Sequence, residues 1–346
     1  MNFSPILANK PIVASVPCRV DFGGTLDIST FYLPLAYMKP ASFNIALNLR
    51  TVVTLSAWTQ NRIKISSRGF ESTECDRDQV PFDHPMGLMF AVASYFNAHG
   101  VHIQINSTSP PRSALGGSSS AAVAIIAAFY AALGEKINPE KIVWLAHSIE
   151  SSVAGVPCGV QDQAAAAFGG VNLWEWEMGE TGPKFNQRKV FENKRDLAAF
   201  NDHLLVAYCG IPHVSKDINK QWVEGFIRGD NRETFKKIVE ITKDFYLAVK
   251  RNNFGLAGEL MVKETRLRLE MTPEVLDNTG KKLFERAVAL NCGARFTGAG
   301  GGGCLWAIGE KDKIVGLATA WQEILEPLEG ATLLDTTIDE NGILIL

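Results

Sequence analysis

A run of apolar residues at 121–133, thirteen in all, constrains the fold of this chain more than any other segment. A helix needs roughly 20 apolar residues to span a bilayer, so this run is too short to cross a membrane. It directly follows Ser118, Ser119 and Ser120, and serine is a preferred residue where a helix starts. The pattern predicts a helix buried inside a soluble protein, with the glycine- and serine-rich loop 113–120 at its N-terminus.

Length and charge narrow the class of protein further. The chain has 346 residues, and a single hydrophobic core stops growing at around 250–300 residues, so we expect two domains. Its 34 Lys and Arg residues against 37 Asp and Glu residues give a net charge of −3. A protein that binds nucleic acid through the phosphates is normally basic. We therefore expect no nucleic-acid partner and no membrane partner.

The cysteines and the first residues indicate a location. The six cysteines are spread along the chain without a CxxC pair, which disfavours a disulfide framework or a zinc site and suits a reducing compartment. The first ten residues lack the basic start and apolar run of a secretory signal. The expected location is the cytoplasm.

The first half of the chain is rich in predicted strands and the second half in predicted helices. Alternating or β-branched residues predict strands at 12–16, 43–47, 51–57, 62–66 and 101–105. Apolar residues at helical spacing predict helices at 85–99, 139–152 and 314–325, and mixed helical stretches within 216–290. Further short strands are expected at 204–208, 305–308, 331–336 and 343–346. We place a domain boundary near 179–201, where Gly, Pro, Asn and Lys interrupt the apolar pattern, and we predict an α+β fold.

The loop before the buried helix has the composition of a phosphate-binding loop. Residues 111–122 read PRSALGGSSSAA, and glycines let several backbone N–H groups converge on one anion. A helix N-terminus favours negative charge, and a serine hydroxyl can complete the ligand shell of a phosphate-bound magnesium ion. The loop lacks the Gly-Lys-Ser/Thr ending of a P-loop. An ordinary turn that caps a core helix is the open alternative.

A second glycine-rich loop, 297–304, reads TGAGGGGC and contains GxGxxG at Gly298, Gly300 and Gly303. That fingerprint indicates dinucleotide binding only between a strand and a helix, with an acidic residue about 20 positions later. Here the loop leads into the apolar residues 305–308, which are typical of a buried strand, so we exclude a Rossmann dehydrogenase. Glycine runs are costly to order. We therefore expect the backbone of this loop to approach a ligand, with a tight turn as the alternative.

Two carboxylates between these loops are candidates for chemistry. Asp162 lies among small and apolar residues, and burying a carboxylate there is costly unless it is paired or used. Glu150 lies near the end of the predicted helix at 139–152. Taken alone, Glu150 is better explained as a solvated residue of its helix than as a chemical group. For Asp162, the corresponding structural explanation, a helix cap, is less convincing than a chemical role.

Together these segments resemble the GHMP kinase superfamily, which includes galactokinase, homoserine kinase, mevalonate kinase and phosphomevalonate kinase. Residues 111–121 resemble its central phosphate motif, 14–24 (ASVPCRVDFGG) its first motif, and 293–304 (GARFTGAGGGGC) its third motif. The three motifs occur in family order across nearly the whole chain. The central motif departs from the family pattern at two positions. Ala114 replaces the usual Gly, which predicts a stiffer loop, and Arg112 is expected to bring a cation near the phosphates.

The resemblance implies a two-domain α+β architecture with ATP and Mg²⁺ as cofactors. The implied domains are 1–195, an N-terminal ATP-binding domain like domain 2 of ribosomal protein S5, and 196–346, a C-terminal ferredoxin-like α/β plait. The implied partners are ATP and a small sugar or sugar-phosphate substrate, with the chain as a monomer or a homodimer.

The resemblance also implies roles for individual residues. The residues implied to hold the ATP phosphates are Ser113, Leu115, Gly116, Gly117, Ser118, Ser119 and Ser120. Mg²⁺ would be bound by Glu150 with Ser118 or Ser119. Asp162 would accept or orient the proton of the attacking hydroxyl, with Arg19 favouring its ionised form. The residues implied to bind the substrate are Arg19, Asp27, Gln163, Gly298, Ala299 and Gly300.

The motifs also indicate a class of acceptor. Asp162-Gln163 resembles the Asp-Gln pair of sugar kinases, and residues 164–170 resemble heptose-phosphate and fucose kinases. The Glu-His-Thr-Asp sugar clamp of galactokinases is absent, which disfavours galactose itself. The resemblance implies phosphoryl transfer from ATP to a sugar or sugar-phosphate hydroxyl, preferably the anomeric one. Two alternatives stay open: a kinase acting on a non-sugar alcohol such as mevalonate, and a non-catalytic regulator that binds sugar and ATP.

Two aromatic or basic residues are weaker candidates. Trp58 follows a predicted strand and is one candidate for the adenine pocket, although an aromatic residue at the solvent edge is the simpler interpretation. The six histidines show no metal-ligand spacing. His213 follows a predicted strand and a Gly-Ile-Pro turn, in a region where some sugar kinases approach their substrate, and an ordinary loop histidine is the simpler interpretation.

Overall fold

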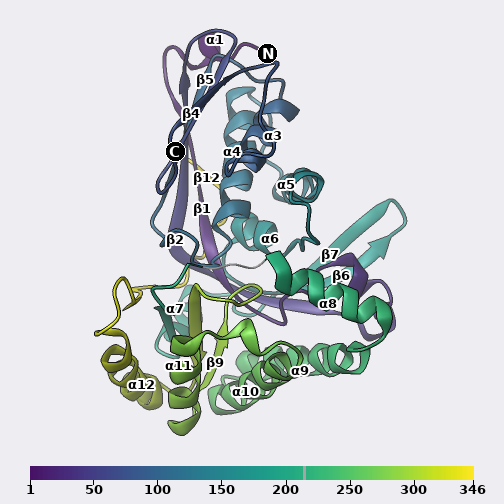
Figure 1. The fold of residues 1–346 in the computed structure, drawn as a ribbon, viewed down its shortest axis with the longest axis vertical. Helices are drawn as coiled ribbons and strands as arrows, with labels where there is room; N and C mark the ends of the chain where they lie inside the picture. The colour runs from purple at the N-terminus through teal and green to yellow at the C-terminus, as the bar shows by residue number, and fades with distance from the viewer. Residues whose placement is uncertain (213–215) are drawn as a thin grey trace.

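A computed structural model describes residues 1–212 and 216–346 and contains two β-sheets with helices packed on them (Figure 1). In this described part, the larger sheet has eight strands in the order β12-β1-β2-β5-β3-β4, and β6 and β7 branch from β2. Its strands are β1 (Ile12–Phe22), β2 (Ala41–Ala57), β3 (Arg62–Ser67), β4 (Thr73–Asp76), β5 (Val101–Ser107), β6 (Val171–Gly179), β7 (Gly182–Lys189) and β12 (Leu344–Ile345). The prediction of an α+β fold is confirmed.

Helix α4 (Gly117–Ala132) is the central helix on this sheet, and it confirms the helix predicted from the apolar run. It is buried on all sides from Ser119 to Tyr130, because strands cover one face and helices the other. The helices packed around it are α3 (Gly87–Tyr95), α5 (Pro139–Val153) and α6 (Gln161–Phe168). Among the described residues, no helix has both the length and the apolar character needed to cross a membrane.

The second sheet belongs to the C-terminal half and has the antiparallel order β11-β8-β10-β9. Its strands are β8 (Leu204–Tyr208), β9 (Gly293–Phe296), β10 (Cys304–Ile308) and β11 (Thr332–Leu333). The helices of this half are α7 (Lys194–Asn201), α8 (Lys216–Arg228), α9 (Arg232–Lys250), α10 (Phe254–Met271), α11 (Asn278–Ala289) and α12 (Lys311–Leu325). The remaining short helices are α1 (Ser4–Leu7), α2 (Ser29–Tyr32), η1 (Ala36–Met38) and η2 (Pro273–Val275).

Several predicted elements had the wrong extent. The strands predicted at 43–47 and 51–57 are one continuous strand, β2, because this strand pairs with β1, β5 and β6 along different parts of its length. The hairpin of β6 and β7 was missed, since its polar outer residues hide the strand pattern. The predicted division between residues 195 and 196 falls inside helix α7.

The C-terminal residues return to the first sheet instead of remaining in the C-terminal half. Strand β12 pairs antiparallel with β1, through Ala14 with Ile345 and Ser15 with Leu344. The Arg50 guanidinium donates hydrogen bonds to the carbonyls of Asn341 (3.1 Å) and Gly342 (2.7 Å), and it also contacts Ser15. The strand predicted at 343–346 is therefore confirmed, but it closes an edge of the N-terminal sheet.

A chain of fully buried ion pairs joins the two halves. Glu264 on α10 accepts hydrogen bonds from Arg268 of the same helix and from Arg295 on β9, both at 2.9 Å. Arg295 in turn donates to Asp21 Oδ2 on β1 at 3.0 Å. Because these four side chains are completely buried, each charge depends on its neighbours to offset the cost of leaving water.

Replacing Glu264 should therefore destabilise the whole protein. The Glu264→Gln variant leaves two buried guanidinium groups without their shared carboxylate, and breaking such a buried pair costs about 3–5 kcal/mol. Glu259→Gln is the matched control, since Glu259 is an exposed residue of the same helix. Urea unfolding at neutral pH measures both changes. Equal stabilities of the two variants would contradict the structural role of Glu264.

Candidate active site

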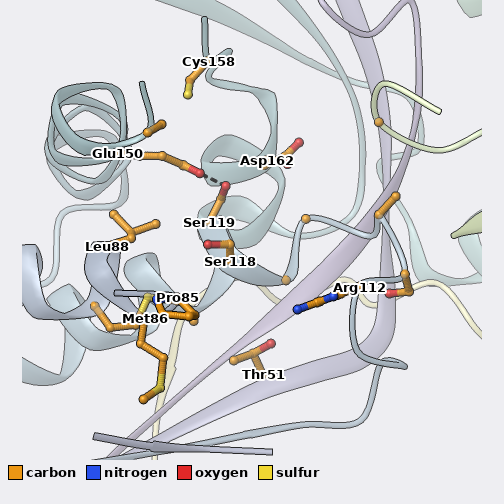
Figure 2. A pocket seen from close by; sticks show the side chains of 18 of the residues that line it. Thr51, Pro85, Met86, Leu88, Arg112, Ser118, Ser119, Glu150, Cys158 and Asp162 are labelled. Atoms are coloured by element: carbon orange, nitrogen blue, oxygen red, sulfur yellow. Dashed lines mark hydrogen bonds between the residues drawn. The ribbon is translucent and has the colours of Figure 1, made fainter. Parts of the chain in front are cut away.

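A cleft of about 710 Å³ brings together the predicted glycine loops and the predicted carboxylates (Figure 2). Its walls come from β1, β5, the loop before α4, and the N-terminal end of α6. Glu150 on α5 lies on the same cleft, and so do Gly298 and Ala299 of the second glycine loop. Segments more than a hundred residues apart in the sequence thus form one site.

The loop before α4 has an unusual backbone. Gly116 precedes the first turn with φ +77°, and the non-glycine residues Arg112 and Ala114 also have positive φ values, +54° and +62°. The first N–H groups of a helix have no acceptor within the helix, so those at the start of α4 are free to bind an anion. Gly116, Gly117, Ser118 and Ser119 line the cleft at this point. The geometry agrees with the predicted phosphate loop.

The two glycine-rich loops pack against each other. The Ser113 carbonyl accepts a hydrogen bond from the Cys304 amide at 2.9 Å. A Cβ atom on Gly303 would lie only 2.7 Å from the same carbonyl oxygen, so only glycine fits this contact. The backbone of the second loop therefore packs closely on the loop before α4, and its approach to a ligand stays a prediction.

Ser119 and Glu150 form the pair expected for a cation site. The Ser119 hydroxyl donates to Glu150 Oε2 at 2.8 Å (Figure 2), and Gln163 Nε2 donates to the same oxygen at 2.5 Å. Burial raises the pKa of the Glu150 carboxyl to about 7, and the nearby Asp162 adds to the rise. A buried carboxylate beside a serine hydroxyl supplies the hard oxygen ligands that Mg²⁺ prefers. Ser118 is exposed at the cleft, so the structure places Ser119 closer to this role.

This pair is compatible with magnesium as a cation shared with ATP. In the parts of the chain that the structure describes, no group of three or more His, Cys, Asp and Glu side chains could hold a metal. Magnesium usually takes one or two protein ligands and completes its shell with substrate phosphates and water. Ser119 and Glu150 would hold it there, and the ion would neutralise charge on the phosphates.

Asp162 is held in place by Arg19. Arg19 Nε donates to Asp162 Oδ1 at 2.8 Å, and Nη2 forms an ion pair with the same oxygen at 2.7 Å. Arg19 Nη1 donates to the Ala114 carbonyl at 2.7 Å. Burial raises the pKa of Asp162, and the Arg19 guanidinium acts in the opposite direction by favouring the carboxylate. Its side chain is still 23% exposed, so one oxygen can reach a ligand. Asp162 and Arg19 therefore meet as predicted.

Asp21 is a central residue that the sequence analysis did not single out. Its Oδ1 accepts the Gly298 amide at 2.7 Å, and Arg19 lies 3.4 Å away. Asp21 thus connects the pair of Arg19 and Asp162 to the second glycine loop. Through Arg295 it also connects this pair to the buried ion pairs of Glu264 and Arg268. One signal was available, since Arg19 and Asp21 stand two positions apart on a strand and so share a face.

Asp27 lines the same cleft as Asp162. Its Oδ2 accepts the Gln161 amide at 2.9 Å, whereas its Oδ1 has no hydrogen-bond partner among the described residues. Burial raises the pKa of Asp27 to about 6. A Cβ on Gly159 would fall 1.7 Å from Asp27 Oδ2, so glycine is required there. This half-satisfied buried carboxylate can accept a hydroxyl hydrogen, as predicted for a substrate ligand.

Four predicted site residues do not line the cleft. Leu115 packs in the core, and the Ser120 hydroxyl donates to the Pro17 carbonyl, because both residues face the sheet. Gln163 is buried and supports Glu150, and Gly300 packs against Val275. Within the described ranges, the roles predicted for these four residues stay predictions.

Of the two weaker candidates, the structure describes only Trp58. Trp58 lies outside the cleft lining, where the Lys64 ammonium is 4.2 Å from its ring centroid, so it is a solvent-edge aromatic. His213 lies outside the described residues. The apolar end of the cleft is formed by Phe70, Phe82, Met86, Leu88 and Met89. No shared motif pointed to these residues, because they come from two loops and from the start of helix α3.

Comparison with known proteins finds relatives that match most of this chain. The model of the family "GHMP kinases N terminal domain" matches residues 85–170, which include the phosphate loop, Glu150 and Asp162. A mevalonate kinase of Thermococcus onnurineus is 27% identical over 96% of this chain and 98% of its own length. A D-glycero-α-D-manno-heptose 7-phosphate kinase of Campylobacter jejuni is 29% identical over 57% of this chain and 58% of its own.

A solved structure supports the fold over the whole length. The galactokinase of Lactococcus lactis in complex with galactose has a TM-score of 0.75, at 19% identity, over 99% of this chain and 98% of that one. The predicted two-domain kinase fold is thereby confirmed. The predicted restriction to sugar kinases is not confirmed, since mevalonate kinases match along nearly the whole chain.

The pH dependence of cation binding gives a test of Glu150. Since Mg²⁺ requires the ionised carboxylate, protons compete with it below the raised pKa of about 7. The apparent Mg²⁺ affinity at saturating ATP should fall towards tenfold per pH unit below pH 7 and level off above it. Glu150→Gln should bind Mg²⁺ more weakly at pH 8, and activity should recover at high magnesium concentration.

Magnesium titrations of activity between pH 6 and pH 8 measure both effects. The protonation of ATP itself affects the parent and the variant equally, so the difference between their profiles isolates Glu150. A loss of activity in Glu150→Gln that no magnesium concentration relieves would instead assign Glu150 a structural role.

Proposed function

We propose an acceptor and a catalytic step for this enzyme from one premise: the chain belongs to the GHMP kinase superfamily and is an ATP-dependent phosphotransferase with an alcohol as acceptor. In this proposal the loop 111–120 holds the phosphates of ATP, Ser119 and Glu150 bind Mg²⁺, and Asp162 serves as the catalytic base. The acceptor is a small molecule whose hydroxyl group reaches Asp162.

One observation carries the proposed step. A Cβ built on Gly116 would lie 3.2 Å from Asp162 Oδ2, so the carboxylate stands directly at the start of the phosphate loop. A hydroxyl bound by Asp162 would therefore lie next to the terminal phosphate of an ATP held by this loop. Phosphoryl transfer depends mainly on such positioning and on neutralising charge.

The step transfers one phosphoryl group and one proton. The acceptor oxygen attacks the γ-phosphorus, the bond from that phosphorus to the bridging oxygen breaks, and ADP leaves. The hydroxyl proton passes to Asp162. Arg19 donates to Asp162 and to the phosphate-loop carbonyl of Ala114, and it thereby holds the proposed base and the loop in fixed relative positions.

Two classes of acceptor have support of different kinds. The comparisons favour a non-sugar alcohol over the sugar implied by the motifs, because the mevalonate kinases match 96% of this chain. The heptose-phosphate kinase matches 57%. A hydroxy acid of the mevalonate type is therefore the candidate that the relatives support.

The charge of the cleft around Asp27 and Asp162, where the proposed acceptor would bind, supports a neutral polyhydroxy compound. Asp27 and Asp162 line the cleft there, and Asp162 is paired with Arg19, whereas Asp27 has no cationic partner among the described residues. An acceptor that carries a carboxylate would meet the negative charge of Asp27. The unpartnered Asp27 Oδ1 suits a hydroxyl donor. We therefore propose a neutral polyol, with sugars as the first compounds to test and mevalonate as the second candidate.

An ADP-release screen decides between these acceptors. The panel contains galactose, fucose, arabinose, mannose, uronic acids, heptose phosphates, mevalonate and homoserine, each with MgATP. We expect the highest kcat/KM with a neutral sugar. A higher value with mevalonate would overturn the charge argument. Tight ATP binding without turnover on any compound would favour the non-catalytic regulator.

The Asp162→Asn variant tests the base. Asparagine keeps the shape of the side chain but accepts no proton, so turnover should fall by about 10²-fold or more, as is typical of a general base. Binding of MgATP, measured by calorimetry, should stay close to that of the parent. Near-normal turnover in this variant would show that another group is the base.

The Asp27→Asn variant should stabilise the empty protein and weaken acceptor binding. Burial raises the pKa of Asp27 from 3.8 to about 6, so above pH 6 its ionisation opposes folding by up to about 3 kcal/mol. The variant should therefore melt at a higher temperature at pH 7.5, and the gain should shrink as the pH falls from about 6 to 4. Its acceptor KM should rise by roughly tenfold or more, since a hydrogen bond to a charge is lost.

Asp83→Asn is the matched control, because Asp83 is an exposed carboxylate on the same cleft. It should change neither the melting temperature nor the acceptor KM. An Asp27→Asn protein with the acceptor KM of the parent would remove Asp27 from the acceptor site.

A further inference from the structure

Two arginines on the cleft have no role in the site described above. Arg68 and Arg112 both line the cleft and are exposed to solvent. Neither forms an ion pair with any carboxylate in the described part of the chain. Arg19, which also lines the cleft, is by contrast committed to Asp21 and Asp162. The cleft thus holds two uncompensated guanidinium groups.

The two arginines come from adjacent loops. Arg68 precedes Gly69 in the turn between β3 and β4, and a Cβ on Gly69 would lie 3.4 Å from Pro111 Cγ. The turn that carries Arg68 therefore touches the segment that carries Arg112. In Figure 2 the Arg112 guanidinium extends into the same space as Ser118 and Thr51.

The backbone that directs Arg112 is strained and held by both halves of the protein. A left-handed φ of +54° is uncommon for a non-glycine residue, and Ala114 repeats it at +62°. Arg19 binds the Ala114 carbonyl, and Cys304 from the C-terminal half binds the Ser113 carbonyl. Such strain persists only where surrounding contacts impose it, and it is concentrated at functional sites.

We propose that Arg112, with Arg68 beside it, binds the polyphosphate of ATP and supplies positive charge that the phosphate loop itself lacks. The inference rests on the proposed function and assigns the nucleotide, not the acceptor, to these arginines. The other charged groups on the cleft are the carboxylates Asp27, Asp83, Glu150 and Asp162 and the paired Arg19. A polyphosphate entering this surface needs cations, and a guanidinium binds phosphate oxygens through paired N–H donors.

Substitution of each arginine by methionine tests this role. Methionine keeps much of the length of the side chain and removes the charge. Arg112→Met should weaken calorimetric binding of MgATP and of inorganic tripolyphosphate by tenfold or more. Binding of adenosine should be unchanged, and Arg68→Met should show a smaller loss with the same ligand pattern. Arg112→Lys should recover part of the affinity.

Arg251→Met is the matched control, since Arg251 is exposed, lies at the end of α9 and forms no ion pair in the described ranges. It should leave all three affinities unchanged. If Arg112→Met does not fold, Arg112→Asn replaces it, because asparagine tolerates the left-handed backbone.

Two results would overturn the inference. One is an Arg112 variant that binds MgATP and tripolyphosphate like the parent. The other is a loss confined to the KM of a phosphorylated acceptor, which would assign Arg112 to the acceptor. Failure of the unsubstituted protein to bind ATP would overturn the proposed function. This result is distinguishable from failure of the inference about Arg112, because it is measured without any variant.

Discussion

The active site depends on a continuous series of alternating charges that begins in the core of the C-terminal half and ends at the catalytic cleft. Arg268, Glu264, Arg295, Asp21, Arg19 and Asp162 follow one another through contacts of 2.7 to 3.4 Å. Buried charges are tolerated only when they are paired. Displacing one side chain of the series would therefore leave its neighbour buried without a partner of opposite charge. The position of Asp162, the proposed base, is therefore tied to helix α10, which lies in the other half of the protein.

The same series also fixes both loops that enclose the ligand. Arg19 binds the phosphate loop at Ala114, and Asp21 binds the second glycine loop at Gly298. Neither loop has the regular hydrogen bonds of a helix or strand to hold its shape, and their glycines favour disorder when free. Two neighbouring charged side chains on β1 thus fix the shape of both loops, and in the proposed function they would hold the phosphates and the base in fixed relative positions.

The sequence predicted the parts of the fold and site that local patterns determine. The apolar run became helix α4, the two glycine loops face one cleft, and Asp162 meets Arg19. It did not predict contacts that depend on chain packing. Strand β2 is continuous only because three neighbours pair with it. Leu115 and Ser120 lie within the phosphate motif, but their side chains point into the protein. This orientation depends on how the loop and helix α4 pack on the sheet, which the motif alone does not determine. The buried partners Glu264 and Arg268 carry no motif at all.

The carboxylates of the cleft show how this frame is used. Burial raises the pKa of Glu150 to about 7 and that of Asp27 to about 6, and it also raises the pKa of Asp162. Each of these groups is therefore less stable as an anion in the empty protein than it would be in water. Ligands that supply positive charge or hydrogen-bond donors, such as a cation at Glu150 and a hydroxyl at Asp27, relieve that cost. In the proposed function, a cation at Glu150 and a hydroxyl at Asp27 would recover part of the free energy spent on burying these groups, so the cleft would favour ligands that supply both.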